Sequence, residues 1–235
     1  MGGCNLKITD ITVKSVSLKM TKPLKVTFGE IDTVKSLILV IHTDADIVGV
    51  GEACPFEPVT GESLATELAA LPVLIQAVYG QDPINIENIH RLMNDTIIGH
   101  TALKAGIDMA LYDILGKRTN LPVYKLLGGS NNHIITDITI SINDSKTMAA
   151  DAKNYVDQGF TQLKVKAGLN PEQDEEAIQA IFDKIGDAAV LKIDANQGWS
   201  PKKTIQVMNR FSGSRLEIVE QPLPAWQTNA NSLIR

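Results

Sequence analysis

The chain has 235 residues, of which 44% are hydrophobic and 21% are charged, and its formal net charge is −5. This composition is typical of a globular protein, and the length suffices for one large domain or two smaller ones. Because the charge is negative and there is no long basic run, we expect no nucleic-acid partner. No apolar stretch reaches the length of a membrane span, and two cysteines do not make a disulfide framework. We therefore expect no membrane partner and a cytoplasmic location.

The N-terminal third of the sequence shows the alternation of apolar and polar residues that is typical of strands. Residues 6–20 predict a strand with one buried face, formed by Ile8, Ile11, Val13, Val16 and Leu18. Lys22-Pro23 is predicted to end this strand, and residues 24–33 have no periodicity and are predicted to be a loop. Two further apolar runs around a polar turn predict a hairpin over residues 34–42 and 47–53. Together these segments predict a three-stranded antiparallel sheet.

Helical spacing of apolar residues predicts three helices after this sheet. The first begins near residue 64, and Pro72 is expected to kink or interrupt it. The second covers residues 86–93, and the third covers residues 102–117 with Thr101 as its N-cap. A turn-rich boundary follows. We therefore predict one domain over residues 1–130 and a second domain over residues 131–235.

The second domain alternates strictly between strands and helices. The predicted strands cover residues 134–142, 160–166, 189–194 and 216–220. The predicted helices cover residues 145–158 and 172–185, with a third opening at Ser200-Pro201. Such alternation predicts right-handed crossovers and a parallel sheet.

Charged residues stand at the C-terminal ends of these predicted strands. Lys166, Asp194 and Glu220 end successive strands at intervals of about 27 residues, roughly the length of a βα unit. Because side chains alternate along a strand, Lys164 shares a face with Lys166, and Asn196 continues the face of Asp194. The C-terminal ends of parallel strands are where α/β barrels place their active sites. The pattern therefore predicts an active site at this edge of the sheet.

The residue types indicate the chemistry. Two carboxylates on adjacent strands repel each other unless a cation lies between them, and oxygen ligands beside an amide favour Mg²⁺. A cation and a second lysine nearby are expected to lower the pKa of a lysine toward the range of a useful base. A lysine base with Mg²⁺ can remove a proton alpha to a carboxylate through an enediolate. The alternative interpretation is that these are ordinary strand lysines and carboxylates; their recurrence at matching strand ends favours a site.

At these residues the sequence resembles a known family. K-V-K at 164–166, I-D-A-N-Q-G-W at 193–199 and V-E-Q-P at 219–222 resemble the enolase superfamily, in particular its muconate-lactonizing subgroup. Dipeptide epimerases of the Ala-Glu type are the most similar, with further resemblance in the segments 49–53, 110–117, 121–129 and 136–141. The resemblance implies an α+β capping domain followed by the first half of a (β/α)₇β barrel. It also implies a Mg²⁺-dependent epimerase or racemase that acts on a dipeptide or another small carboxylate.

The same resemblance implies roles for the charged residues. Lys166 would be an acid/base and Lys164 its electrostatic partner, while Asp194 and Glu220 would be two of three Mg²⁺ ligands. In the family the third ligand lies on the next barrel strand, and the opposing lysine lies one strand further. Because the sequence stops at Arg235, we expect a C-terminally truncated chain with four of the usual eight barrel strands.

The substrate contacts implied by the resemblance involve Thr139, which would line the pocket, Asn196, which would support the site, and the loop near Phe28, which would close over it. Ala-Glu epimerases tend to carry an arginine where Gly29 stands, which argues against a dipeptide that contains Glu. Cycloisomerase and o-succinylbenzoate synthase activities are alternatives within the superfamily. A catalytically inactive fragment is another alternative, and the sequence leaves open whether the protein is a homo-oligomer.

Overall fold

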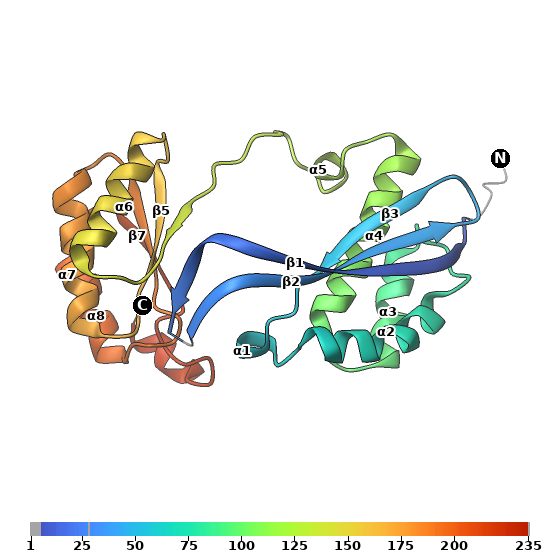
Figure 1. The fold of residues 1–235 in the computed structure, drawn as a ribbon, viewed down its shortest axis with the longest axis horizontal. Helices are drawn as coiled ribbons and strands as arrows, with labels where there is room; N and C mark the ends of the chain where they lie inside the picture. The colour runs from blue at the N-terminus through green and yellow to red at the C-terminus, as the bar shows by residue number, and fades with distance from the viewer. Residues whose placement is uncertain (1–5, 28, 235) are drawn as a thin grey trace. The chain divides into compact units, whose positions relative to one another are not determined.

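The computed structural model describes residues 6–27 and 29–234, which form two compact units. The first unit includes residues 6–20 and 33–133, and the second includes residues 21–32 and 134–234. The strands β1 and β2 continue from one unit into the other, so the end of their hairpin belongs to the second unit (Figure 1). The predicted domain boundary between residues 130 and 131 stays a prediction.

The first unit combines a three-stranded sheet with helices. The sheet has the order β1-β2-β3, and its strands are Ile8–Val26, Gly29–Thr43 and Val48–Ala53. The helices α1 to α5 are Glu57–Thr60, Leu64–Val78, Ile86–Thr96, Thr101–Thr119 and Val123–Leu126. Alternate β2 residues Leu37, Leu39 and Ile41 are fully buried in a core that they share with α2, α3 and α4. The predicted three-stranded sheet is therefore confirmed.

Strand β1 is longer than the sequence predicted. It passes through Lys22 and Pro23, so both the predicted strand end and the predicted loop over residues 24–33 are wrong. Because β1 is an edge strand, one of its sides needs no N–H donors, and proline is tolerated there. The predicted buried face also fails along part of the strand: Ile8 is buried, whereas Leu18 is 61% exposed.

Helix α2 runs through Pro72, so the predicted interruption is wrong, while the alternative of a kink stays a prediction. A proline inside a helix removes one hydrogen bond and crowds the preceding turn. Packing can outweigh that cost, and α2 buries Leu71 and Leu74 in the core on either side of the proline. Tertiary contacts therefore override the local propensity here.

The N-terminus of α4 is capped by a residue from a distant part of the chain. The predicted N-cap, Thr101, is instead the first residue of the helix. The carboxylate of Glu62 accepts hydrogen bonds from the backbone N–H groups of Thr101 (2.6 Å) and Ala102 (3.0 Å) and from the Thr101 hydroxyl (3.1 Å). A carboxylate there satisfies donors that a helix leaves unpaired and complements the helix dipole.

We expect Glu62→Gln to lower the free energy of unfolding by about 2 kcal/mol at neutral pH, because it removes charge-assisted capping bonds. Burial raises the pKa of Glu62, but bonds from Ala102 and Thr101 outweigh it, and the net pKa lies below its ordinary 4.5. The stabilisation is therefore complete above pH 4.5 and is lost as the pH falls through the folded-state value.

Denaturant unfolding between pH 3 and pH 7 measures this effect. The difference between the original protein and Glu62→Gln should shrink at the acid end. Glu87→Gln, an exposed carboxylate in the first turn of α3, is the matched control and should change little. A Glu62→Gln difference that stays constant with pH would contradict the assignment.

The second unit is a parallel sheet covered by helices. The strands β4 to β7 are Ile138–Ile140, Gln162–Lys166, Val190–Asp194 and Leu216–Glu220, in the order β4-β5-β6-β7. The helices α6, α7 and α8 are Ser145–Asp157, Pro171–Ile185 and Pro201–Arg210, and the 3₁₀ helix η1 is Thr228–Leu233. All three neighbouring strand pairs are parallel, as predicted. Strand β4 is shorter than predicted, because Ile134 and Ile135 are exposed and lie outside it.

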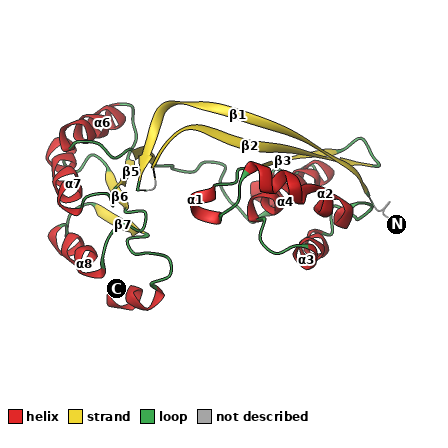
Figure 2. Ribbon diagram, turned by 60° about the horizontal axis from the view of Figure 1, so that its bottom comes forward, coloured by secondary structure: helices red, strands yellow, loops and turns green. Residues whose placement is uncertain are grey.

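The two faces of this sheet differ sharply in chemistry. Leu163, Val165 and Leu191 are buried with residues of α6 and α7, which lie along one face with α8 (Figure 2). On the intervening positions, Lys164 and Lys166 point to the other face, because side chains alternate along β5. The helix-covered face is therefore the core, and the opposite face carries the charges.

Candidate active site

The strand register aligns the charged residues that the sequence singled out. Lys166 lies opposite Asp194, and Asp194 lies opposite Glu220, so the three form one row across β5, β6 and β7. Two residues before Lys166 on β5, Lys164 lies opposite Thr139 of β4. Parallel strands in register bring their C-terminal residues to the same edge, and this is the edge at which the row stands.

The row is joined by ion pairs. The Nζ atom of Lys166 donates to Asp194 Oδ2 at 2.6 Å. The Nζ atom of Lys164 lies 3.1 Å from the same oxygen and 2.6 Å from Glu220 Oε2. One positive centre therefore contacts both carboxylates.

The ion pairs outweigh burial in setting the electrostatic balance of the cluster. Burial raises the pKa of Asp194, but bonds from Lys166, the Asn196 N–H and Lys164 outweigh burial, so the net pKa is lowered. Burial lowers the pKa of Lys164, but the contacts with Glu220 and Asp194 outweigh it, so the net pKa is raised. For Lys164, the two carboxylates thus have a larger effect than burial, and the lowered pKa of one lysine beside a cation stays a prediction.

Asn196 lies directly after the row and holds an unusual conformation. Its φ of +42° is in the left-handed region, and its N–H donates to Asp194 Oδ1 at 3.0 Å. The Thr27 hydroxyl donates to the Asn196 carbonyl at 2.9 Å. The side-chain Oδ1 of Asn196 is buried, and no described residue supplies a hydrogen bond to it. A buried oxygen without a partner, on a residue whose N–H binds Asp194, is a candidate ligand or support for a cation.

These oxygens fit part of a Mg²⁺ site. Mg²⁺ is commonly bound through one or two carboxylates with water completing its coordination. Asp194 and Glu220 already converge on one positive nitrogen, and Asn196 adds the unpartnered oxygen. Within residues 6–27 and 29–234, no group of three or more His, Cys, Asp or Glu side chains is arranged to hold a metal.

Of the residues predicted to contact the substrate, Thr139 is described by the structure and Phe28 is not. Thr139 is half-buried beside Lys164 in the row below the charged residues. Phe28 lies outside the described residues. Thr27, which bonds to the Asn196 carbonyl, was missed by the sequence analysis, because a lone threonine in a segment predicted to be a loop carries no distinguishing pattern.

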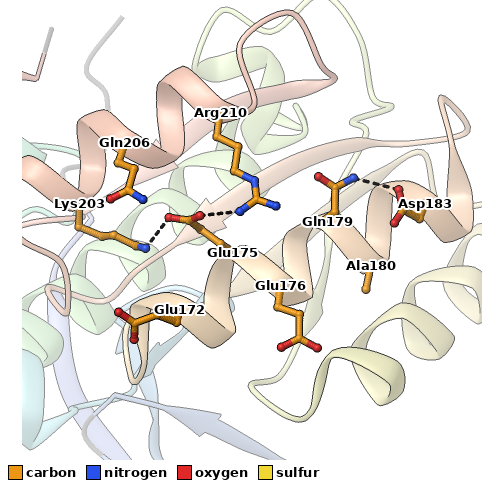
Figure 3. A pocket seen from close by; sticks show the side chains of 9 residues that line it. All are labelled: Glu172, Glu175, Glu176, Gln179, Ala180, Asp183, Lys203, Gln206 and Arg210. Carbon is orange, nitrogen blue, oxygen red and sulfur yellow. Dashed lines mark hydrogen bonds and ion pairs between the residues drawn. The ribbon is translucent and has the colours of Figure 1, made fainter.

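A surface cavity of about 520 Å³ lies elsewhere, between α7 and α8 (Figure 3). None of the strand-end residues lines it. Its buried carboxylate, Glu175, is ion-paired with Lys203 and, at 2.7 Å, with Arg210. Because that carboxylate is already neutralised by two cations, the cavity does not compete with the strand-end row as the candidate active site.

The architecture of a sheet-and-helix unit followed by parallel βα units, with lysines and carboxylates at the strand ends, defines a protein of the enolase-superfamily class. Residues 8–128 match the model of the mandelate racemase / muconate lactonizing enzyme N-terminal domain, and residues 147–235 match that of the enolase C-terminal domain-like family. The chain belongs to the mandelate racemase / muconate lactonizing enzyme family.

Several relatives are epimerases. The chain is 38% identical over 218 residues to the hydrophobic dipeptide epimerase of Enterococcus faecalis, covering 93% of this chain and 62% of the relative. It is 37% identical over 230 residues to the L-Ala-D/L-Glu epimerase of Clostridium acetobutylicum, covering 97% and 64%. The crystal structure of the Enterococcus faecalis dipeptide epimerase with Mg and the dipeptide L-Leu-L-Tyr superposes with a TM-score of 0.94 at 36% identity, covering 97% of this chain and 64% of that one.

The chain thus spans less than two thirds of the length of these relatives. Among the helices of the described residues, none is long and apolar enough to cross a membrane.

Proposed function

We propose that the protein is a Mg²⁺-dependent epimerase of dipeptides that acts by removing the proton alpha to a carboxylate. The observation that carries the proposal is the row of Lys166, Asp194 and Glu220, with Lys164 in contact with both carboxylates. In this proposal Lys166 is the acid/base and Lys164 its electrostatic partner. Asp194 and Glu220 bind Mg²⁺, and the similarity to dipeptide epimerases supports the reaction class.

The chemistry follows from charge. Mg²⁺ bound by Asp194 and Glu220 would supply positive charge that stabilises the enediolate. Lys166 takes the α-proton through its Nζ atom, which requires the neutral amine. The 2.6 Å contact with Asp194 holds this Nζ atom at the strand end.

The substrate class is the finer part of the proposal. We propose a dipeptide without an acidic side chain, because Gly29 offers no cation to pair with one. A side-chain carbon at Gly29 would have no atom within 4 Å apart from its chain neighbours. Thr139 beside Lys164 would contact the substrate, and the role of Phe28 stays a prediction.

Exchange of the α-proton in D₂O, followed by mass spectrometry over a panel of dipeptides, tests the reaction. Deuterium entering the α-carbon is the expected result. Deuterium uptake reports proton removal alone, so it detects the action of Lys166 even where inversion is incomplete. No uptake from any dipeptide, with turnover of a muconate instead, would replace the epimerase by a cycloisomerase. No turnover of any of these substrates would contradict an enzymatic role.

Binding of Mg²⁺ by Asp194 and Glu220 should raise the melting temperature of the protein. At ten times the dissociation constant, a ligand that binds only the folded state adds about 1.4 kcal/mol, which is about 4 °C for a chain of this size. We expect Glu220→Gln to lose most of this shift. Glu217→Gln, an exposed carboxylate three residues earlier on the same strand, should keep it. A shift that is equal in both variants would remove Glu220 from the metal site.

A further inference from the structure

Asp174, in the first turn of α7, accepts hydrogen bonds from two of the loops that follow the strands of the candidate site. Its Oδ2 atom accepts from the indole Nε1 of Trp199 at 2.8 Å and from the backbone N–H of Gly168 at 2.9 Å. Asp174 is 6% exposed and Trp199 is 2% exposed. Burial raises the pKa of Asp174, although the bonds from Trp199 and Gly168 oppose this shift. Burying a carboxylate costs free energy unless it is hydrogen-bonded. The two donors from different loops therefore indicate a structural role for Asp174 beyond packing.

The two donors belong to the loops that carry the candidate site. Gly168 follows Lys166 by two residues, and Trp199 follows Asn196 by three. The backbone N–H of Trp199 also donates to the carbonyl of Pro222 at 2.9 Å, two residues beyond Glu220. One carboxylate is thereby connected to the ends of β5, β6 and β7.

These strand ends need to be held, because their backbone is strained. Asn196, Gln197 and Gln221 have φ values of +42°, +70° and +38°. A non-glycine residue in the left-handed region costs about 1–3 kcal/mol and persists only when its surroundings impose the conformation. Bonds to Asp194 and between Gln197 N–H and Gln221 C=O (2.8 Å) fix these residues to one another. Asp174 anchors the group to helix α7.

The loops also touch backbone to backbone. A side-chain carbon at Gly168, whose φ is +105°, would lie 2.0 Å from the Ala195 carbonyl oxygen. A side-chain carbon at Gly198 would lie 2.1 Å from the Gly168 carbonyl oxygen. With no side chain between them to absorb movement, a displacement of Gly168 shifts the residues next to Asp194.

We propose that Asp174 is a positioning residue, which holds the strand-end loops so that Lys166, Asp194 and Glu220 keep the spacing required to bind Mg²⁺ and react. The metal part of this inference rests on the proposed function, whereas the holding of the loops does not. Groups that orient the ligands of a metal site commonly change metal affinity 10–100-fold when they are removed.

The adjacent residue provides a matched control. Glu175 is also buried and charged, and it lies on the same turn of α7. Its partners, Lys203 and Arg210, belong to α8 and not to a strand-end loop. Loss of either carboxylate disturbs the packing of α7, but only loss of Asp174 releases the loops.

Two measurements test the inference: Mg²⁺ affinity by isothermal titration calorimetry, and amide hydrogen exchange over residues 195–199. For Asp174→Ala we expect Mg²⁺ binding about tenfold weaker and exchange about tenfold faster. Asp174→Asn, which keeps a carbonyl acceptor, should recover most of both. Glu175→Ala should leave both within about twofold of the original protein. Equal effects of Asp174→Ala and Glu175→Ala, or no effect of Asp174→Ala, would overturn the inference.

Measuring Mg²⁺ affinity and hydrogen exchange separately distinguishes a failure of this inference from a failure of the proposed function. If the original protein binds no Mg²⁺, the proposed metal site fails, and hydrogen exchange alone decides whether Asp174 holds the loops. If Asp174→Ala does not fold, Trp199→Phe is measured in its place. It removes a single donor and keeps the aromatic ring, so we expect the same effects at about a threefold level, and unchanged exchange at residues 195–199 would refute the inference.

Discussion

Replacing Lys166 with alanine is expected to lower the rate of deuterium uptake at the α-carbon of a dipeptide by about a thousandfold, the contribution of a general base. The Nζ atom of Lys166 is placed at the strand end by pairing with Asp194 at 2.6 Å. Alanine removes the only atom of this side chain that can carry the proton. Binding of Mg²⁺ should survive, because Asp194 and Glu220 remain.

Lys166→Arg distinguishes a base from a simple positive charge. Arginine keeps the cation beside Asp194 but does not deprotonate in proteins, so it should be as inactive as alanine. The matched control is Lys192→Arg. Lys192 lies on the same face of the sheet, opposite Lys164 in the register, and pairs with Asp137 at 3.2 Å. Uptake that persists in Lys166→Arg would show that Lys166 acts through its charge and not as the base.

Replacing Gly51 with alanine is expected to lower the free energy of unfolding by about 3 kcal/mol, the upper range for overpacking a core. Strand β3 lies against α4 with backbone in contact. A side-chain carbon at Gly51 would lie 1.9 Å from the Gly106 carbonyl oxygen and 3.0 Å from the Ala110 nitrogen. Neither group belongs to a flexible side chain, so the helix itself must move.

Urea unfolding of the variant measures this effect. Glu52→Ala is the control, because Glu52 is the next residue of β3 and faces solvent. Its effect should stay within about 0.5 kcal/mol. A Gly51→Ala protein as stable as Glu52→Ala would show that β3 and α4 have room to separate.

The candidate site was largely predictable because its geometry is local and periodic. Side chains alternate along a strand, which fixes the shared face of Lys164 and Lys166. Parallel strands of similar length end together, which aligns Lys166, Asp194 and Glu220 without further information. Their catalytic and metal-binding roles stay proposals, since no ligand contact has tested them.

The contacts that support the site could not be predicted in the same way. Thr27 and Asp174 are separated in sequence from the residues that they hold, and neither belongs to a periodic pattern. The raised pKa of Lys164 could not be predicted either. The sequence showed the neighbouring lysine, whereas the balance depended on the distances from Lys164 to Asp194 and Glu220.

By itself, the sequence determined the order of the βα units and the charged edge of the parallel sheet, because both depend on spacing along the chain. Its motifs at 164–166, 193–199 and 219–222 resembled the superfamily to which the chain belongs. Only the tertiary structure showed that β1 continues through Pro23, that Glu62 caps α4 and that Asp174 accepts hydrogen bonds from the loops after β5 and β6. These features arise only when distant segments of the chain come into contact: the edge position of β1, the cap from a distant loop and the buried hydrogen-bond acceptor. Their energies come from tertiary contacts, which local propensity and periodicity do not indicate.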